Sequence, residues 1–282
     1  MLFMISIGAT FLVVGSIAWL QALYLGSIVF CLWSGLDALN NVFDADLDEI
    51  SDPSRAKYTK RLGRTGLLVA IVFSILSSSM GAITMSPLVL VFILVGVFFG
   101  IVYSVPPLRL RQTVYKPIVN FTVGAVPILI IASFANTFSA SVVTLMLLIG
   151  ITTAVNSLGE DLADYASDLA NGAKTIPIIL GVKKGLLFTI LMGYSLIPLM
   201  VSVGIMFKLP PIYYITLSAI TAFLSLRIYL NRATLFKSSE IDNKGLLKLG
   251  EILAKDFVIA AIIQTTNLGI SSYIGLSSLI PL

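Results

Sequence analysis

The chain has 282 residues, of which 57% are hydrophobic and only 11% are charged, and its formal net charge is +4. A soluble globular domain carries charge at about a quarter of its positions, so this composition excludes that class and indicates a polytopic membrane protein. The sequence has no histidine and one cysteine, Cys31, which excludes an intrachain disulfide, metal sites built on imidazole and the usual serine-hydrolase triad.

Apolar runs between polar breaks predict about nine membrane-spanning helices in one all-α membrane domain over residues 1–282. The first run starts at Met1 without a basic segment or a small-residue cleavage site, which favours a retained helix over a signal peptide. The predicted ranges, in chain order, are 3–20, 22–43, 65–82, 86–104, 117–135, 138–158, 185–206, 211–230 and 252–276.

The charges predict the orientation of these helices. Almost every Lys and Arg lies in or beside the loops that follow the second, fourth, sixth and eighth helices, whereas Lys208 lies on the other side. The positive-inside rule places the first group of loops in the cytoplasm, and basic residues so placed indicate orientation rather than nucleic-acid binding. The acidic residues gather on the same side. We therefore expect a multi-pass protein of the cell membrane with its active site facing the cytoplasm.

A first acidic cluster closes the second predicted helix. Asp37, Asn41, Asp44 and Asp48 recur at intervals of three or four residues and form one polar stripe on a helix. Like charges at this spacing repel one another, so a bound cation would compensate them. The neighbouring asparagine amide oxygens are further ligands for a hard cation.

A second acidic cluster closes the sixth predicted helix, with Asp161, Asp164 and Asp168 at the same intervals. Two such stripes on the same side of the membrane predict a shared site. An all-oxygen donor set without histidine or thiolate suits Mg²⁺, which commonly bridges carboxylates to substrate phosphate oxygens. The sequence therefore predicts Mg²⁺ as cofactor and a phosphorylated or diphosphorylated lipid as ligand.

Basic residues lie close to both clusters. Arg55 follows the first, Arg109 and Arg111 lie in the loop after the fourth helix, and Lys174 follows the second. Beside Mg²⁺, such side chains can hold the remaining diphosphate oxygens and stabilise charge on a leaving group. The alternative is that each of them only sets the orientation of the chain in the membrane.

These segments together resemble the UbiA-type intramembrane prenyltransferases, in order and over nearly the whole chain. The first cluster resembles the signature N-D-x-x-D-x-x-x-D, with Asn41 where Asp is common, and Pro53 and Arg55 fall where it continues towards P-x-R. The second is similar to D-x-x-D-x-x-x-D followed by G-x-K-T-x-P at 172–177. The segment 103–111, Y-S-V-P-P-L-R-L-R, is similar to Y-S-x-P-P-L-x-L-K.

The resemblance implies a helical bundle around a central cavity, with acidic motifs at the cytoplasmic ends of the second and sixth helices holding two Mg²⁺ and a polyprenyl diphosphate. By this resemblance, the catalytic residues would be Asp44, Asp48, Asp164 and Asp168. The metal ligands would be Asn40, Asp44, Asp48, Asp161, Asp164 and Asp168. The diphosphate would contact Asn40, Arg55, Tyr103, Arg109, Arg111 and Lys174.

The expected reaction is Mg²⁺-dependent transfer of a polyprenyl group to a lipophilic acceptor within the membrane. The acceptor stays open among an aromatic quinone precursor, an ether-lipid precursor, a carotenoid and a chlorin, and the 103–111 loop looks less like the ether-lipid branch. Asn41 in place of Asp removes one charge, and the polar segment that often precedes the first helix in this family is absent.

Two other classes are considered. A prenyl diphosphate cyclase on the same scaffold would ionise the donor without needing an acceptor. A transporter would carry charges near the membrane midplane on broken helices, whereas here the third to seventh predicted helices are almost free of charge and the acids collect at one rim. Prenyl chain length and oligomeric state are not predicted.

Overall fold

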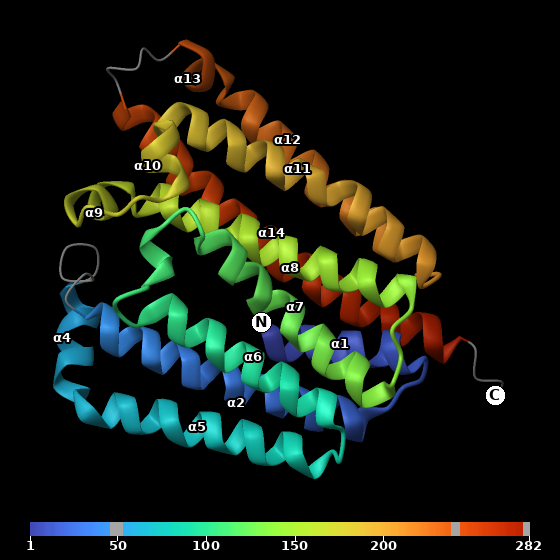
Figure 1. The fold of residues 1–282 in the computed structure, drawn as a ribbon. Coiled ribbons are helices and arrows are strands. Elements are labelled where there is room, and N and C mark those ends of the chain that lie inside the picture. Colours follow the sequence, from blue (N-terminus) through green and yellow to red (C-terminus); the bar gives the residue numbers. More distant parts are fainter. Residues whose placement is uncertain (46–52, 238–242, 279–282) are drawn as a thin grey trace.

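The computed structural model describes residues 1–45, 53–237 and 243–278, and this part of the chain is helical (Figure 1). The first half contains α1 (Leu2–Val14), α2 (Trp19–Asp44), α4 (Pro53–Leu62), α5 (Arg64–Ile83), α6 (Pro87–Ser104), the 3-10 helix η1 (Leu110–Gln112) and α7 (Lys116–Ala135). The second half contains α8 (Ala140–Ala163), α9 (Tyr165–Ala170), α10 (Ile176–Leu180), α11 (Val182–Met206), α12 (Pro211–Leu230), α13 (Arg232–Lys237) and α14 (Asn243–Ser277).

Each predicted membrane-spanning range falls on a helix, so the all-α fold class is confirmed. Within the described residues, 7 helices are long and apolar enough to cross a membrane: α2, α5, α6, α7, α8, α11 and α12. Of the remaining two, α1 has only 13 residues and α14 is a 35-residue helix that begins well before the predicted start at residue 252. The chain is a multi-pass membrane protein, while the count of nine spans stays a prediction.

The predicted first helix over 3–20 is wrong at its C-terminal end. Gly15 adopts a left-handed conformation, with φ 70°, and its N–H donates to the carbonyl of Phe11. This is a common way for a helix to stop, because glycine enters the left-handed region without a Cβ penalty. The chain then turns and α2 begins at Trp19, so α1 covers only part of the bundle's length and the N-terminus lies midway along it (Figure 1).

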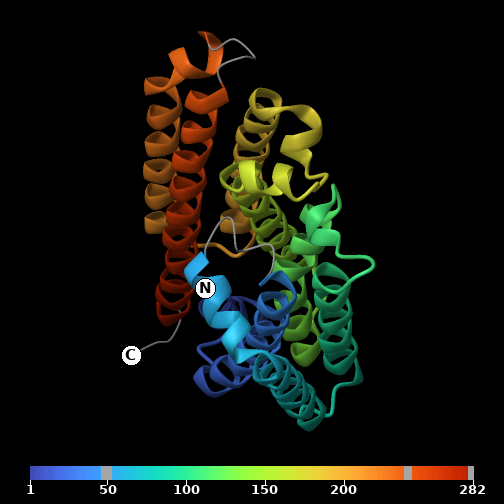
Figure 2. The same cartoon turned by 90° about the vertical axis from the view of Figure 1, so that its left-hand side faces the viewer.

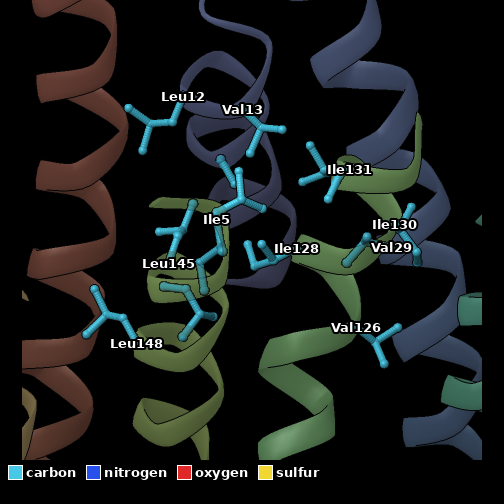
Figure 3. Close-up of a cluster of buried hydrophobic side chains, with 14 of the residues drawn as sticks. Ile5, Leu12, Val13, Val29, Val126, Ile128, Ile130, Ile131, Leu145 and Leu148 are labelled. Atoms are coloured by element: carbon cyan, nitrogen blue, oxygen red, sulfur yellow. The ribbon is translucent and has the colours of Figure 1, made fainter. Parts of the chain in front are cut away.

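The helices run up and down in an elongated bundle (Figures 1 and 2). At its centre α1 contacts α2, α7 and α14, and α8 contacts α7, α11 and α14. Figure 3 shows the resulting apolar core, in which Ile5 of α1 lies beside Ile128 of α7 and Leu145 of α8. By contrast, only 22% of the apolar stretch of α5, 22% of that of α11 and 11% of that of α12 is buried, as expected of helices that face lipid.

Gly124 allows α7 to pack closely against α8. A Cβ placed on Gly124 would collide with the backbone carbonyl of Ile149 and with the Thr153 hydroxyl. That hydroxyl also donates to the carbonyl of Asn120 at 2.7 Å, which ties the two helices together. Small residues at helix crossings are typical of membrane proteins, because association there depends on close packing rather than on the hydrophobic effect. This contact fixes α7 against α8 near the site described below.

We predict that Gly124→Ala destabilises the protein by about 1–3 kcal/mol, because the added methyl group forces α7 away from α8. Thermal melting of the purified protein in detergent measures this. Gly269→Ala in α14 is the matched control, since a Cβ there meets no atom within 4 Å. Equal melting temperatures for both variants would contradict the tight α7–α8 contact.

Candidate active site

The three sequence motifs converge at one end of the bundle, where α2, α6 and α8 end and η1 lies (Figure 1). A cavity of about 560 Å³ opens there between α2, α6, α7 and α8. A second hollow, of about 460 Å³, shares Trp33, Asp37 and Asn120 with it and extends towards the start of α1. The two hollows together confirm the expected cavity inside the bundle. Its polar lining consists of Asp37, Asn40, Tyr103, Ser104, Arg111, Lys116, Asn120, Thr122, Glu160 and Asp164.

The first acidic cluster lies in the last turns of α2. The amide oxygen of Asn40 accepts a hydrogen bond from the Ser104 hydroxyl at 3.1 Å, which joins α2 to the end of α6. Asp44 is the last residue of α2 and is fully buried. The third member of the predicted motif, Asp48, lies outside the described residues.

Asp44 is compensated by two arginines from the loop after α6. One carboxylate oxygen lies 3.3 Å from Nη2 of Arg109, and the other forms an ion pair with Arg111. Arg109 also donates to the carbonyl of Phe43 and has a left-handed backbone with φ 37°. Both arginines, predicted to bind diphosphate, therefore contact the first acidic cluster, and Arg111 also lines the cavity.

The second acidic cluster does not form one continuous helical stripe as predicted. Asp161 lies in the last turn of α8, Asp164 occupies the junction at which α8 ends, and Asp168 lies in the short helix α9. The backbone at Asp164 departs from helical geometry, with φ −90° and ψ 7°. Asp164 therefore reaches the cavity, whereas Asp161 is buried beneath it.

Arg111 links the two clusters electrostatically. Burial lowers the pKa of Arg111 below its ordinary value, and the negative charges of Asp168 and Asp164 oppose that shift. Burial in turn raises the pKa of Asp168, and the positive charges of Lys116 and Arg111 oppose it. These groups thus share one electrostatic field around the cavity.

Lys116 also lines the cavity, although the sequence did not single it out. In the sequence it is one of many basic residues that lie beside predicted membrane-spanning helices. Its ammonium lies 2.6 Å from Oδ1 of Asp161 and 3.7 Å from Glu160, and the residue is only 6% exposed. One signal in the sequence was its position just before Pro117, which marks the first turn of a helix. A cation is unfavourable at that end of the helix dipole unless an acid compensates it.

Two residues predicted to contact the diphosphate, Lys174 and Arg55, are not among the described side chains that line the cavity. The Lys174 side chain is exposed, although its backbone N–H donates to the carbonyl of Gln112 at 2.8 Å and so ties the 172–177 segment to the loop that carries Arg109 and Arg111. Arg55 lies in α4, and its side chain is outside the described part of the structure.

The donor chemistry of the site fits Mg²⁺. Carboxylates from both clusters and the amide of Asn40 supply oxygen ligands only. Within the described residues, no group of three metal-ligating side chains already converges on one point, and the two buried carboxylates, Asp44 and Asp161, form ion pairs with basic side chains.

Comparison with known proteins identifies the family of this chain. Residues 1–237 match the model of the UbiA prenyltransferase family. The chain is 24% identical, over 67% of its length and 72% of the relative's, to the digeranylgeranylglyceryl phosphate synthase of Methanothrix thermoacetophila. It is 26% identical to the synthase of the same name from Halobacterium salinarum, over 57% of the chain and 58% of that relative.

Solved structures share the fold. A structure from work on digeranylgeranylglyceryl phosphate synthase in membranes has a TM-score of 0.66 at 19% identity and covers 94% of this chain and 90% of its own. A UbiA homologue from Archaeoglobus fulgidus, bound to GPP and Mg²⁺, has a TM-score of 0.57 at 17% identity, covering 93% of this chain and 94% of its own. The match of residues 1–237 to the family model shows that this chain belongs to the UbiA family and is a prenyltransferase.

Proposed function

We propose that this prenyltransferase transfers a polyprenyl group, in the presence of Mg²⁺, from an isoprenoid diphosphate to a glycerol phosphate ether-lipid precursor. The observation that carries the proposal is a cavity lined by residues of both acidic clusters and by the cations Arg111 and Lys116. The relatives named digeranylgeranylglyceryl phosphate synthase favour the ether-lipid acceptor over the aromatic, carotenoid and chlorin alternatives.

Asn40, Asp44 and Asp48 from the first cluster, with Asp164 and Asp168 from the second, are the proposed ligands of Mg²⁺. Bound there, Mg²⁺ would neutralise the diphosphate and stabilise the charge on the leaving group. Arg109 and Arg111 would leave Asp44 and donate to diphosphate oxygens, since guanidinium groups recognise phosphate well. Tyr103 lines the same cavity, where its hydroxyl is a further donor.

Apolar side chains form the rest of the cavity wall, among them Trp33, Leu36, Phe99 and Val123. They suit an isoprenoid chain and exclude water from the reacting carbon. The C–O bond to the diphosphate breaks with its electron pair on the leaving oxygen. The acceptor hydroxyl oxygen then forms a new bond to the allylic carbon and loses its proton. Without water nearby, transfer outcompetes hydrolysis of the donor.

We further propose that the cavity end of the bundle faces the cytoplasm. The loops at this end carry nearly all the Lys and Arg residues, and Figure 1 places the ends of α2, α6, α8 and α12 together there. The positive-inside rule gives this end a cytoplasmic location.

The first prediction concerns metal dependence. Asp44→Asn and Asp168→Asn are expected to lower turnover by at least about a hundredfold, because each removes a charged ligand while nearly preserving shape. Product formation with Mg²⁺ and geranylgeranyl diphosphate measures this, with EDTA as a parallel treatment. Glu251→Gln is the control, since Glu251 is an exposed acid that pairs with Lys255. Full activity in EDTA would contradict the metal site.

The second prediction concerns the acceptor. The purified protein, given Mg²⁺ and geranylgeranyl diphosphate, is expected to release diphosphate in step with prenylated product when geranylgeranylglyceryl phosphate is added. Little product is expected with 4-hydroxybenzoate or with no acceptor. Mass spectrometry of the lipid extract separates these cases. Product formed only with the aromatic acceptor would overturn the ether-lipid proposal, and abundant hydrocarbon without acceptor would indicate a cyclase.

The third prediction concerns sidedness. In a Cys31→Ser background, a cysteine at Ala166 is expected to react with an impermeant maleimide only from the cytoplasmic face, and one at Met85 only from the opposite face. Both positions are exposed and lie at opposite ends of the bundle. Labelling intact cells and inverted vesicles reads out the result. Reversed labelling would refute the cytoplasmic placement.

A further inference from the structure

Two buried carboxylates, Asp44 and Asp161, each pair with a cation that lines the cavity, but the two pairs are built differently. Asp44 meets Arg109 and Arg111, which both come from the loop between α6 and α7. Asp161 meets Lys116, and these two side chains come from the helices α8 and α7. A loop can re-aim its side chains at small cost, whereas two packed helices hold theirs in place.

The α7–α8 contact fixes Lys116 relative to Asp161. Asn120, one turn after Lys116, donates from its side chain to the Lys116 carbonyl at 3.1 Å. The Asn120 carbonyl in turn accepts from the Thr153 hydroxyl of α8, two turns before Asp161. Gly124 allows the close crossing just beyond this point. The pair therefore belongs to the rigid part of the structure.

The Lys116 ammonium retains hydrogen-bonding capacity towards the cavity. It has three N–H donors, and among the described residues Asp161 is the group that accepts one of them. Glu160 lies at 3.7 Å, beyond hydrogen-bond length. Lys116 lines the cavity together with Tyr103 and Asn120, so its ammonium has donors left for a ligand that enters this space.

We propose that Lys116 binds a substrate phosphate oxygen and that Asp161 is its positioning residue rather than a ligand of Mg²⁺. This inference rests on the proposed function, since it assigns a further role within the same cavity. The pair carries no net charge, so it can stay buried before the substrate arrives. Once a phosphate enters, the ammonium donates to it while Asp161 keeps the side chain aimed.

The phosphate has two possible sources, which are the diphosphate of the donor and the phosphate of the glycerol lipid acceptor. Steady-state kinetics separate them. Lys116→Met is expected to raise the KM of one of the two substrates about tenfold or more, as is usual for loss of a hydrogen bond to a charged group. Lys116→Arg, which keeps the charge, is expected to restore much of the loss. Lys255→Met, an exposed lysine in an ion pair with Glu251, is the matched control.

Removing Lys116 alone leaves Asp161 as an unpaired buried charge, and the single variant could fail to fold. The double variant Lys116→Met/Asp161→Leu removes both charges, so the phosphate contact can still be tested in a folded protein. Its melting temperature without ligands is expected to stay near that of the wild type, while the raised KM remains. An unchanged KM for both substrates in the folded double variant would overturn the phosphate contact.

The role of Asp161 is tested by metal affinity rather than by activity. Mn²⁺ binding, followed by electron paramagnetic resonance in saturating inorganic pyrophosphate, is expected to change less than about threefold in Asp161→Asn and more than about tenfold in Asp164→Asn. Equal losses in both variants would make Asp161 a metal ligand and overturn the assignment. A wild-type protein that binds neither Mn²⁺ nor pyrophosphate would instead contradict the proposed function itself.

Discussion

The need to neutralise buried carboxylates governs this end of the molecule. Asp44 and Asp161 are fully buried at the ends of two central helices, where an unpaired charge would cost several kcal/mol. Each carboxylate therefore meets a basic side chain, from the loop after α6 in one case and from the start of α7 in the other. These two pairs join that loop to the end of α2 and the start of α7 to the end of α8, and their cations Arg111 and Lys116 line the cavity.

The two pairs also have different proposed roles in the site. The arginines that pair with Asp44 lie on a loop, and in the proposed mechanism they turn to the diphosphate when Mg²⁺ takes their place, so that Asp44 has a cationic partner before and after binding. Lys116 and Asp161 lie on helices locked by Gly124 and the Thr153 hydrogen bond, which favours a fixed contact. In the proposed mechanism, each of these two buried carboxylates has a cationic partner before the ligands bind, and the site is assembled by an exchange of counterions at Asp44.

Much of this arrangement follows from the sequence, because membrane helices and paired acidic stripes leave strong local signals. The apolar runs located the helices, and the motifs singled out Asn40 and Arg111, which line the cavity, and Asp44, which pairs with Arg111. The sequence did not predict the end of α1 at Gly15, since an apolar run continues through that residue. It also did not distinguish Lys116 from its basic neighbours, because burial and a partner 45 positions away depend on tertiary packing.

The most direct test of this account is a structure of the protein with Mg²⁺ and a thio-substituted, unreactive analogue of geranylgeranyl diphosphate. The account predicts that Asp44 contacts the metal, that Arg109 and Arg111 donate to diphosphate oxygens, and that the Lys116–Asp161 pair stays intact. A structure in which Arg111 still pairs with Asp44 while metal and diphosphate are bound elsewhere would contradict the exchange of counterions on which the account depends.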